Sequence, residues 1–336
     1  MILTEAALAG LIAEALARHG MSARNAVLVA AVVAAAERDG AASHGVLRMP
    51  GYIATLKSGW VDGTAEPVVE QPAPAIVMVD ARNGFAQVAH AAAREAGLAA
   101  VREAGMAAIC IRDSHHFAAL WPDVEPFAEQ GLVALTVVNT RSRIVVWGGK
   151  RKVLGTNPMA FACPRADAPP FVWDQASSLR AQGEVLLART EGHRVPEGVG
   201  LDAAGNPTTD PAAILDGGAL LPFGGHKGAG IAFMIEVLAA ALTGGRFGFL
   251  DESAKFPGAQ TSNAGQFLLL IDPARSAGDA FAGRVSALVA ALREAGSERL
   301  PGEARQRRRE QALRDGIVVP DAAYQRLLAM TQEATG

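Results

Sequence analysis

Apolar residues recur at helical spacing at both ends of the chain. The helices that this spacing predicts near the N-terminus span residues 4–18, 22–38 and 45–58. Those predicted near the C-terminus span residues 284–295, 303–314 and 322–333. Thr4 and Ser22 stand where N-caps are expected, and Gly59 ends the third helix. Both ends of the chain are therefore expected to be helical.

The middle of the chain alternates between short apolar runs and helical spacing, with no internal repeat. The strands predicted there span residues 75–79, 106–111, 133–138, 159–162, 171–173 and 266–271. The helices predicted there span residues 87–104, 121–130 and 229–242. This alternation predicts an α/β (α+β) fold. Helical ends around a strand-rich middle predict one lobe from residues 1–75 and 275–336 and a second lobe from residues 76–274.

Composition narrows the class of protein. Half of the 336 residues are apolar and 19% are charged, which argues against a disordered chain. The formal net charge is −3, with acidic and basic residues interspersed, which argues against a surface that binds nucleic acid. Cys110 and Cys163 lie in apolar stretches and are too few for a disulfide framework, so we expect reduced core residues.

The sequence also predicts a cytoplasmic protein. Residues 1–17 are apolar at helical spacing, but they carry Glu5 and Glu14 and no basic start, unlike a signal peptide. No apolar run free of charges reaches the length of about eighteen residues that a membrane span requires. Neither a membrane nor a nucleic acid is therefore expected as a partner.

The most informative stretch is residues 39–52, which follows a predicted helix and contains several glycines. Ser43 and His44 place a hydroxyl beside an imidazole, the side chain that carries protons near neutral pH. Arg48 lies one helical turn further on, where it can clamp a carboxylate with two N–H groups, and Tyr52 follows it. The pattern fits a catalytic segment, and it equally fits a polar helix end with a solvated arginine.

A second stretch, residues 113–122, follows a predicted strand and leads into a helix, which is where ligands collect in α/β folds. His115 and His116 are adjacent in an extended segment, so their side chains are expected to point to opposite sides. One of them can then face a ligand. The alternatives are a pair of turn histidines and a metal site, and the lack of an HxxxH pattern argues against the metal.

Two further stretches carry polar chemistry. A strand runs into Asp174, a carboxylate that can orient a histidine elsewhere in the chain or cap the segment after it. Glycines at residues 224–230 precede a predicted helix, and Lys227 adds a positive charge there, which favours anion binding. This stretch matches neither the P-loop pattern nor GxGxxG, so an ordinary nucleotide-binding loop is not predicted.

Together these stretches resemble the malate/L-lactate dehydrogenase type 2 family of NAD(P)H-dependent oxidoreductases. The matching pieces run in family order over nearly the whole chain: Ser43-His44-Gly45 with Arg48 and Tyr52, and residues 114–117, 155–158, 174–178, 208–211, 224–228 and 301–303. Residues 115–127 and 214–228 look most like the branch that reduces the cyclic imino acids Δ1-piperideine-2-carboxylate and Δ1-pyrroline-2-carboxylate.

The resemblance implies a homodimer whose cofactor lies on a largely antiparallel, non-Rossmann sheet domain beside a helical lobe built from both termini. It implies His44 as proton donor, with Ser43 and Asp174 as its polar partners, and His116 as the competing catalytic residue. The cofactor contacts that it implies are His116, Phe117, Ala118, Ala119, Leu120, Thr140, Asp174, Gln175, Ala176, Gly224, Gly225, His226, Lys227 and Gly228. No metal ligand is implied.

The function expected from the resemblance is reduction of a cyclic imino acid to L-pipecolate or L-proline, with NADPH as cofactor and NADH as the other candidate. Arg48 and Tyr52 would hold the substrate, a hydride would reach C2, and His44 would supply the proton. The nearest alternative is an NAD(P)-dependent 2-hydroxy acid dehydrogenase acting on malate, lactate or ureidoglycolate. A non-catalytic binding module is a further alternative. Another is a metal hydrolase built on His115, His116 and His226.

Overall fold

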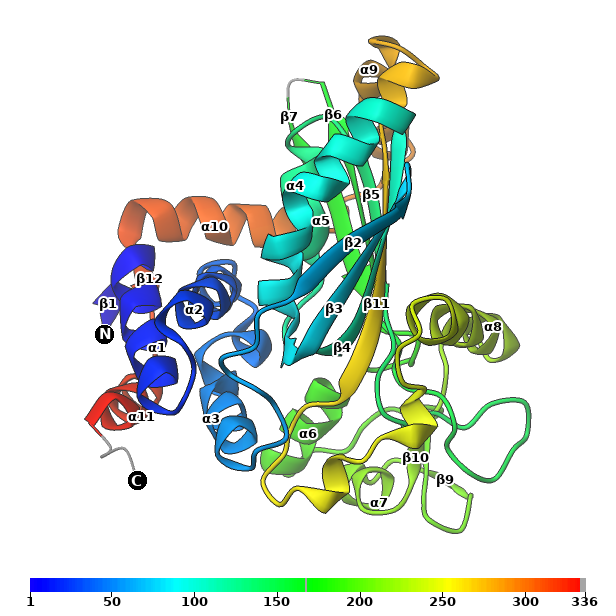
Figure 1. The fold of residues 1–336 in the computed structure, drawn as a ribbon. Helices are drawn as coiled ribbons and strands as arrows, with labels where there is room; N and C mark the ends of the chain where they lie inside the picture. Colours follow the sequence, from blue (N-terminus) through cyan, green and yellow to red (C-terminus); the bar gives the residue numbers. More distant parts are fainter. Residues whose placement is uncertain (167, 333–336) are drawn as a thin grey trace.

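A seven-stranded sheet forms the centre of the protein, and its α/β architecture confirms the predicted class (Figure 1). The computed structural model describes residues 1–166 and 168–332. Neighbouring strands pair antiparallel, except β3 and β4, which run parallel. In spatial order the strands are β2 (Val68–Ala73), β3 (Ile76–Phe85), β4 (Met106–His115), β11 (Asn263–Ile271), β5 (Val133–Val138), β6 (Met159–Arg165) and β7 (Ala168–Gln175).

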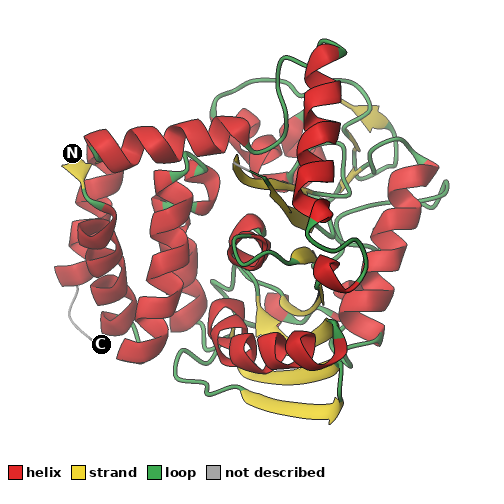
Figure 2. Ribbon diagram, turned by 90° about the horizontal axis from the view of Figure 1, so that it is seen from above, coloured by secondary structure: helices red, strands yellow, loops and turns green. Residues whose placement is uncertain are grey.

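Helices surround this sheet and extend to one side of it (Figure 2). They are α1 (Glu5–Arg18), α2 (Ala23–Arg38), α3 (Met49–Lys57), α4 (Ala86–Ala104), α5 (Trp121–Ala128), α6 (Gln182–Thr190), α7 (Pro211–Leu215), α8 (His226–Glu236), α9 (Ala280–Glu294), α10 (Glu303–Asp315) and α11 (Asp321–Gln332). The short strands are β1 (Ile2–Leu3), β8 (Gly200–Leu201), β9 (Pro207–Thr208), β10 (Ala219–Leu220) and β12 (Ile317–Val318). The short helical turns are η1 (Ala42–His44), η2 (Val46–Arg48), η3 (Val237–Ala241), η4 (Gly248–Leu250), η5 (Ser253–Lys255) and η6 (Pro273–Arg275).

Different helices cover the two faces of the sheet. In β4, Ile109 and Ile111 belong to the buried cluster that includes side chains of α4 and α5. Cys110, between them, belongs to the cluster that includes side chains of α8 and η3. Because side chains alternate between the faces of a strand, residues 106–111 of β4 are apolar at every position and so serve both layers. Both cysteines are buried and free, as predicted.

Helices from the two ends of the chain pack against one another. Leu8 of α1, Val29 of α2 and Leu327 of α11 share one buried cluster, and β1 pairs with β12. Thr4 and Ser22 accept hydrogen bonds from the first turns of α1 and α2, which confirms both predicted caps. No helix in the described part of the chain is long and apolar enough to cross a membrane.

The other C-terminal helices reach the sheet. Helix α9 packs along β6, where the Ser286 hydroxyl hydrogen-bonds with the backbone of Ala166. Helix α10 runs from the β7 side of the sheet to α2, where Arg309 forms an ion pair with Asp39 (Figure 1). The residues after 275 therefore contact both the sheet and the N-terminal helices, and the division of the chain into two lobes stays a prediction.

Some predicted elements differ from the structure. Residues 45–58 are η2 followed by α3 rather than one helix, because Gly45 has a ψ of −140° and Pro50 suits only the first turn of a new helix. The edge strand β2 was missed, and only residues 171–173 of β7 were predicted. Both strands contain prolines, which are tolerated at sheet edges. Helix α6 was missed, and α8 begins earlier than predicted, at His226.

Candidate active site

The segment from Ser43 to Arg48 is a compact hydrogen-bonded unit. Ser43 Oγ lies 3.1 Å from His44 Nδ1, and Arg48 Nε donates to the Ser43 carbonyl at 2.6 Å. The Arg48 guanidinium lies over the Phe117 ring, 4.6 Å from its centroid. Its two terminal nitrogens have no hydrogen-bond acceptor among the described residues. The sequence motif therefore folds into a fixed guanidinium beside an imidazole.

Tyr52 is a buried support of this unit. Its hydroxyl donates to the Phe117 carbonyl at 3.1 Å and accepts from Gln87 Nε2 at 3.1 Å. The side chain is fully buried, and burial raises the pKa of the phenol. This geometry gives Tyr52 the task of holding Phe117 under Arg48, and it does not support the substrate contact predicted from the sequence.

His44 is neutral in the structure at neutral pH. Burial lowers the pKa of His44 to about 4, and the positive charges of Arg48 and His116 act in the same direction. Asp174 is not among the groups that shift the pKa of His44, and its role as a polar partner of His44 stays a prediction. Without an acidic partner, this imidazole gains a proton only when the charge around it changes.

Asp174 lies at the end of β7, beside the start of α5. Burial raises the pKa of Asp174, while Arg305 and the backbone N–H groups of Leu120 and Trp121 oppose that rise. The carboxylate therefore caps the entry to α5, a helix that precedes it in the sequence, rather than the segment after it. Its pairing with a histidine stays a prediction. Ala119 and Leu120, predicted as cofactor contacts, bury their side chains in the core, so only their backbone can meet a ligand.

The two adjacent histidines point to different surroundings, as predicted. His115 is fully buried between Thr261 Oγ1, at 2.7 Å from Nδ1, and Asn83 Oδ1, at 2.8 Å from Nε2. His116 Nε2 lies 2.8 Å from Asp123 Oδ2. The sequence analysis missed Asp123, because an acid in the first turn of a helix normally indicates only favourable charge at the helix start.

A cleft of about 420 Å³ opens beside Arg48. It is lined by Gln175, Ala176, Ser178, Leu179, Ala181, Glu184 and Phe223. A Cβ atom built on Gly183 would stand 3.8 Å from Arg48 Nη2, so the start of α6 joins the cleft to the arginine. Gln175 and Ala176 were predicted as cofactor contacts, whereas the α6 residues were missed together with their helix.

The glycine-rich stretch forms the turn before α8. Gly224 and Gly225 have φ angles of 55° and 61°, which side chains rarely adopt, and a Cβ atom on Gly228 would collide with the Phe223 backbone. His226 and Lys227 form the first turn of α8. The N–H groups of Lys227 and Gly228 already donate to carbonyls within the turn, at Gly224 and Phe223. Anion binding here therefore depends on the Lys227 side chain and stays a prediction.

Thr140 lies where β5 leaves the sheet. Its Oγ1 accepts from the Thr156 N–H at 3.1 Å, and its own N–H donates to Asn157 Oδ1 at 3.0 Å. These bonds tie the ends of β5 and β6 together. Thr140 therefore shapes the same edge of the sheet from which His115 and Asp174 emerge.

Helix α10 contributes one arginine whose N–H groups lack partners. Arg305 lies over the Trp121 ring at 4.7 Å, and its buried Nε and Nη2 have no acceptor among the described residues. Arg309, by contrast, is held by Asp39 at 2.6 Å and Glu125 at 2.5 Å. Of these two arginines, only Arg305 has buried N–H groups left for a ligand.

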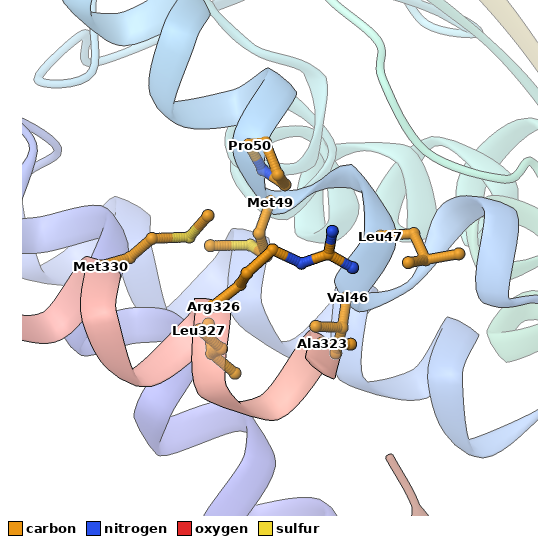
Figure 3. Close-up of a pocket in the computed structure, with 8 residues that line it drawn as sticks. All are labelled: Val46, Leu47, Met49, Pro50, Ala323, Arg326, Leu327 and Met330. Atoms are coloured by element: carbon orange, nitrogen blue, oxygen red, sulfur yellow. The ribbon is translucent and has the colours of Figure 1, made fainter. Parts of the chain in front are cut away.

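A small pocket of about 90 Å³ lies on the far side of the η2 segment, against α11 (Figure 3). It is lined by Val46, Leu47, Met49, Pro50, Ala323, Arg326, Leu327 and Met330. The lining is mostly apolar, with the Arg326 side chain extended between the two helices (Figure 3). Helix α11 thus braces the segment that carries Arg48, and a pocket of this size is too small for a dinucleotide.

The structure does not assemble the residues of the metal-hydrolase alternative. His115 and His116 have the separate partners given above, and His226 lies on α8. Among the described residues, no three His, Cys, Asp or Glu side chains are grouped so that they could hold a metal ion. The chemistry that the site does assemble is a guanidinium for an anion beside a histidine for a proton.

Several known proteins are similar to this chain over most of its length. A Δ1-pyrroline-2-carboxylate/Δ1-piperideine-2-carboxylate reductase of Pseudomonas putida is 52% identical over 310 residues, which are 92% of this chain and 91% of the relative. A (2R)-3-sulfolactate dehydrogenase (NADP(+)) of Chromohalobacter salexigens is 41% identical over 316 residues, 94% of this chain and 93% of the relative.

The fold has a close counterpart among solved structures. The crystal structure of Δ1-piperideine-2-carboxylate reductase from Pseudomonas syringae pvar. tomato superposes with a TM-score of 0.97 at 51% identity, covering 98% of this chain and 99% of that one. The family model for malate/L-lactate dehydrogenase matches residues 3–328. The chain belongs to the malate/L-lactate dehydrogenase family.

Proposed function

We propose that this protein is an NADPH-dependent reductase of cyclic imino acids, converting Δ1-piperideine-2-carboxylate or Δ1-pyrroline-2-carboxylate to L-pipecolate or L-proline. The observation that carries the proposal is Arg48, fixed over Phe117 with free terminal nitrogens, next to His44 and the cleft. The relatives from Pseudomonas, which are named for these two substrates, supply the substrate class.

Arg48 anchors the substrate. Because its Nε is used by the Ser43 carbonyl, the two terminal nitrogens remain for the carboxylate of the imino acid. The bound reduced nicotinamide supplies the hydride that reaches C2. Because the guanidinium is held in place, a carboxylate bound to it fixes the position of the C=N bond in the cleft. Such positioning can account for a large part of the reduction in the activation barrier.

His44 holds the proton for the imine nitrogen. In the free protein the charge of Arg48 helps to keep the pKa of His44 at about 4. A carboxylate bound to Arg48 offsets that charge, so the pKa of His44 rises when substrate is present. Ser43 Oγ occupies Nδ1, which leaves Nε2 as the nitrogen that holds the proton toward the substrate. Substrate binding thus recruits the proton that the reaction consumes.

The residues present fit a phosphate-bearing cofactor. The buried N–H groups of Arg305 lack an acceptor among the described residues, and the Gly224-Gly225 turn places Lys227 in the first turn of α8. The cofactor would lie on the largely antiparallel sheet rather than on a Rossmann domain, with the terminal helices as a second lobe. We also propose a homodimer in the cytoplasm, for which the mass in solution and fractionation of cells are the tests.

We expect NADPH to be used with a higher kcat/KM than NADH. Arg305 offers two charged N–H groups, and one charge-assisted hydrogen bond contributes ~1.5–3 kcal/mol, or roughly 10- to 100-fold. Arg305→Gln should therefore reduce the ratio of the two kcat/KM values by about tenfold. Arg307→Gln, an exposed neighbour on the same helix, is the matched control. Equal kcat/KM values of the wild-type protein with NADPH and NADH would contradict the expected preference.

The second candidate function is a 2-hydroxy acid dehydrogenase, favoured by the sulfolactate dehydrogenase relative. Its substrate would use Arg48 in the same way, and His44 would protonate a carbonyl oxygen instead of an imine nitrogen. A panel of cyclic imines and 2-oxo acids, each assayed with NADPH and NADH, distinguishes the two. A higher kcat/KM for a 2-oxo acid than for either cyclic imine would contradict the proposed function.

A further inference from the structure

A buried carboxylate lies behind His116. Asp123 on α5 is 8% exposed, and its Oδ2 lies 2.8 Å from His116 Nε2. The same oxygen lies 3.5 Å from His90 Nε2 on α4 and accepts a hydrogen bond from Gln266 Nε2 on β11 at 2.9 Å. Three segments that are distant in sequence thus converge on one carboxylate oxygen, and two of them, through His116 and Gln266, hydrogen-bond with it.

The hydrogen bonds define the protonation of this cluster. Burial alone would raise the pKa of Asp123, but His90, His116 and Gln266 outweigh burial, so the carboxyl is ionised. An ionised carboxylate only accepts hydrogen bonds, so the proton of a neutral His116 ring must be on Nε2. Its Nδ1 is then the nitrogen that can gain or release a proton.

The cluster is linked to the candidate site at two points. His116 is close enough to His44 for its charge to depress the pKa of His44. Phe117, the next residue, lies under Arg48, and its carbonyl is held by Tyr52. A change in the orientation or charge of His116 is therefore expected to affect both His44, the proton carrier, and Arg48, the carboxylate anchor.

We propose that Asp123 is a positioning residue for the reductase reaction, which rests on the function proposed above: it fixes His116 as the Nε2–H form and balances its charge. One carboxylate balances one imidazolium, so His116 can become charged without leaving a net charge in the interior.

The first test is the tautomer of His116, read by nitrogen NMR of protein labelled at histidine and assigned with His116→Gln. We expect Nε2–H in the wild type at a pH where the ring is neutral. In Asp123→Asn the amide can donate to Nε2, so Nδ1–H should appear. An Nδ1–H ring in the wild type, or the same tautomer in both proteins, would overturn the proposal. This readout needs no substrate, and the wild-type result stands even if the variant fails to fold.

The second test is kinetic. Asp123→Asn should lower kcat for imine reduction by about tenfold, with KM and the Kd for NADPH changed much less. Its high-pH limb should move to lower pH, because the site loses a negative charge that favours a protonated donor. The other titratable groups facing this cluster, on four elements, stay in place: His90, His44, Arg48 and Tyr52.

A mutant cycle separates positioning from structural support. Asp123→Asn in a His116→Ala background should cost no further kcat, because its effect passes through His116. Equal losses in both backgrounds would overturn the proposal. Asp39→Asn, another buried carboxylate held by Arg309, is the matched control and should lower Tm without moving the pH limb. If only 2-oxo acids react, the proposed function fails, yet the cycle can be run on them and the tautomer result is unaffected.

Discussion

We expect His44→Ala to lower kcat for imine reduction by ~10²–10⁴-fold, the usual contribution of a positioned proton donor. The Kd for NADPH should change little, because His44 contacts Ser43 and lies near Arg48 rather than the glycine turn of α8. Stopped-flow measurement of NADPH oxidation in a single turnover, with cofactor binding measured separately, gives both quantities. His44 is a small part of the core, so the variant should keep its fold.

The assignment of His44 as proton donor also predicts the direction in which the rate changes with pH. A donor must carry its proton when the hydride arrives, so reduction should slow as pH rises through the pKa of His44 in the substrate complex. That pKa should lie above the value of about 4 in the free protein, because the substrate carboxylate offsets the charge of Arg48. His116→Ala is the matched comparison. Near-native turnover of His44→Ala with an unchanged high-pH limb would transfer the donor role to His116.

The helices of both ends could be predicted because local and global signals agree there. Thr4 and Ser22 cap helices whose apolar faces share one buried cluster, so periodicity and capping point to the same boundaries. The edge strand β2 could not be predicted in the same way, and β7 was predicted only at residues 171–173. The prolines of both strands argue against a strand locally, and only the sheet context, in which an edge strand can lack N–H donors, permits them.

The site shows a similar division. His44 and Arg48 could be named from the sequence because one short segment holds both, and the structure keeps them together. The acidic partner of a site histidine could not be named from the sequence, because it depends on which strand end meets which helix. Asp174 lies near the end of β7, where it accepts from the first N–H groups of α5, a contact that the order of residues along the chain does not reveal. Asp123, in the first turn of α5, faces inward and binds His116.

Arg48→Lys should raise the KM for the imino acid while leaving the Kd for NADPH nearly unchanged. Lysine keeps the charge but loses the planar fork, so the expected loss is ~1–3 kcal/mol, or roughly 5- to 150-fold in KM. The substitution also removes the Nε bond to the Ser43 carbonyl and the contact with the Phe117 ring. Steady-state kinetics over a range of imine concentrations, with fluorescence titration of NADPH, measures the two effects separately.

The control for this variant is Arg326→Lys, on the α11 side of the same segment. It tests whether any loss of an arginine next to residues 46–50 disturbs catalysis, and KM should remain within about twofold of wild type, as expected for a surface change. The two variants also differ in how they affect His44. In Arg48→Lys the lysine retains a positive charge near the imidazole, so the high-pH limb should move little while KM rises. Normal binding of the imino acid with lost binding of NADPH would instead place Arg48 in the cofactor site, and the carboxylate anchor would have to be sought elsewhere along the cleft.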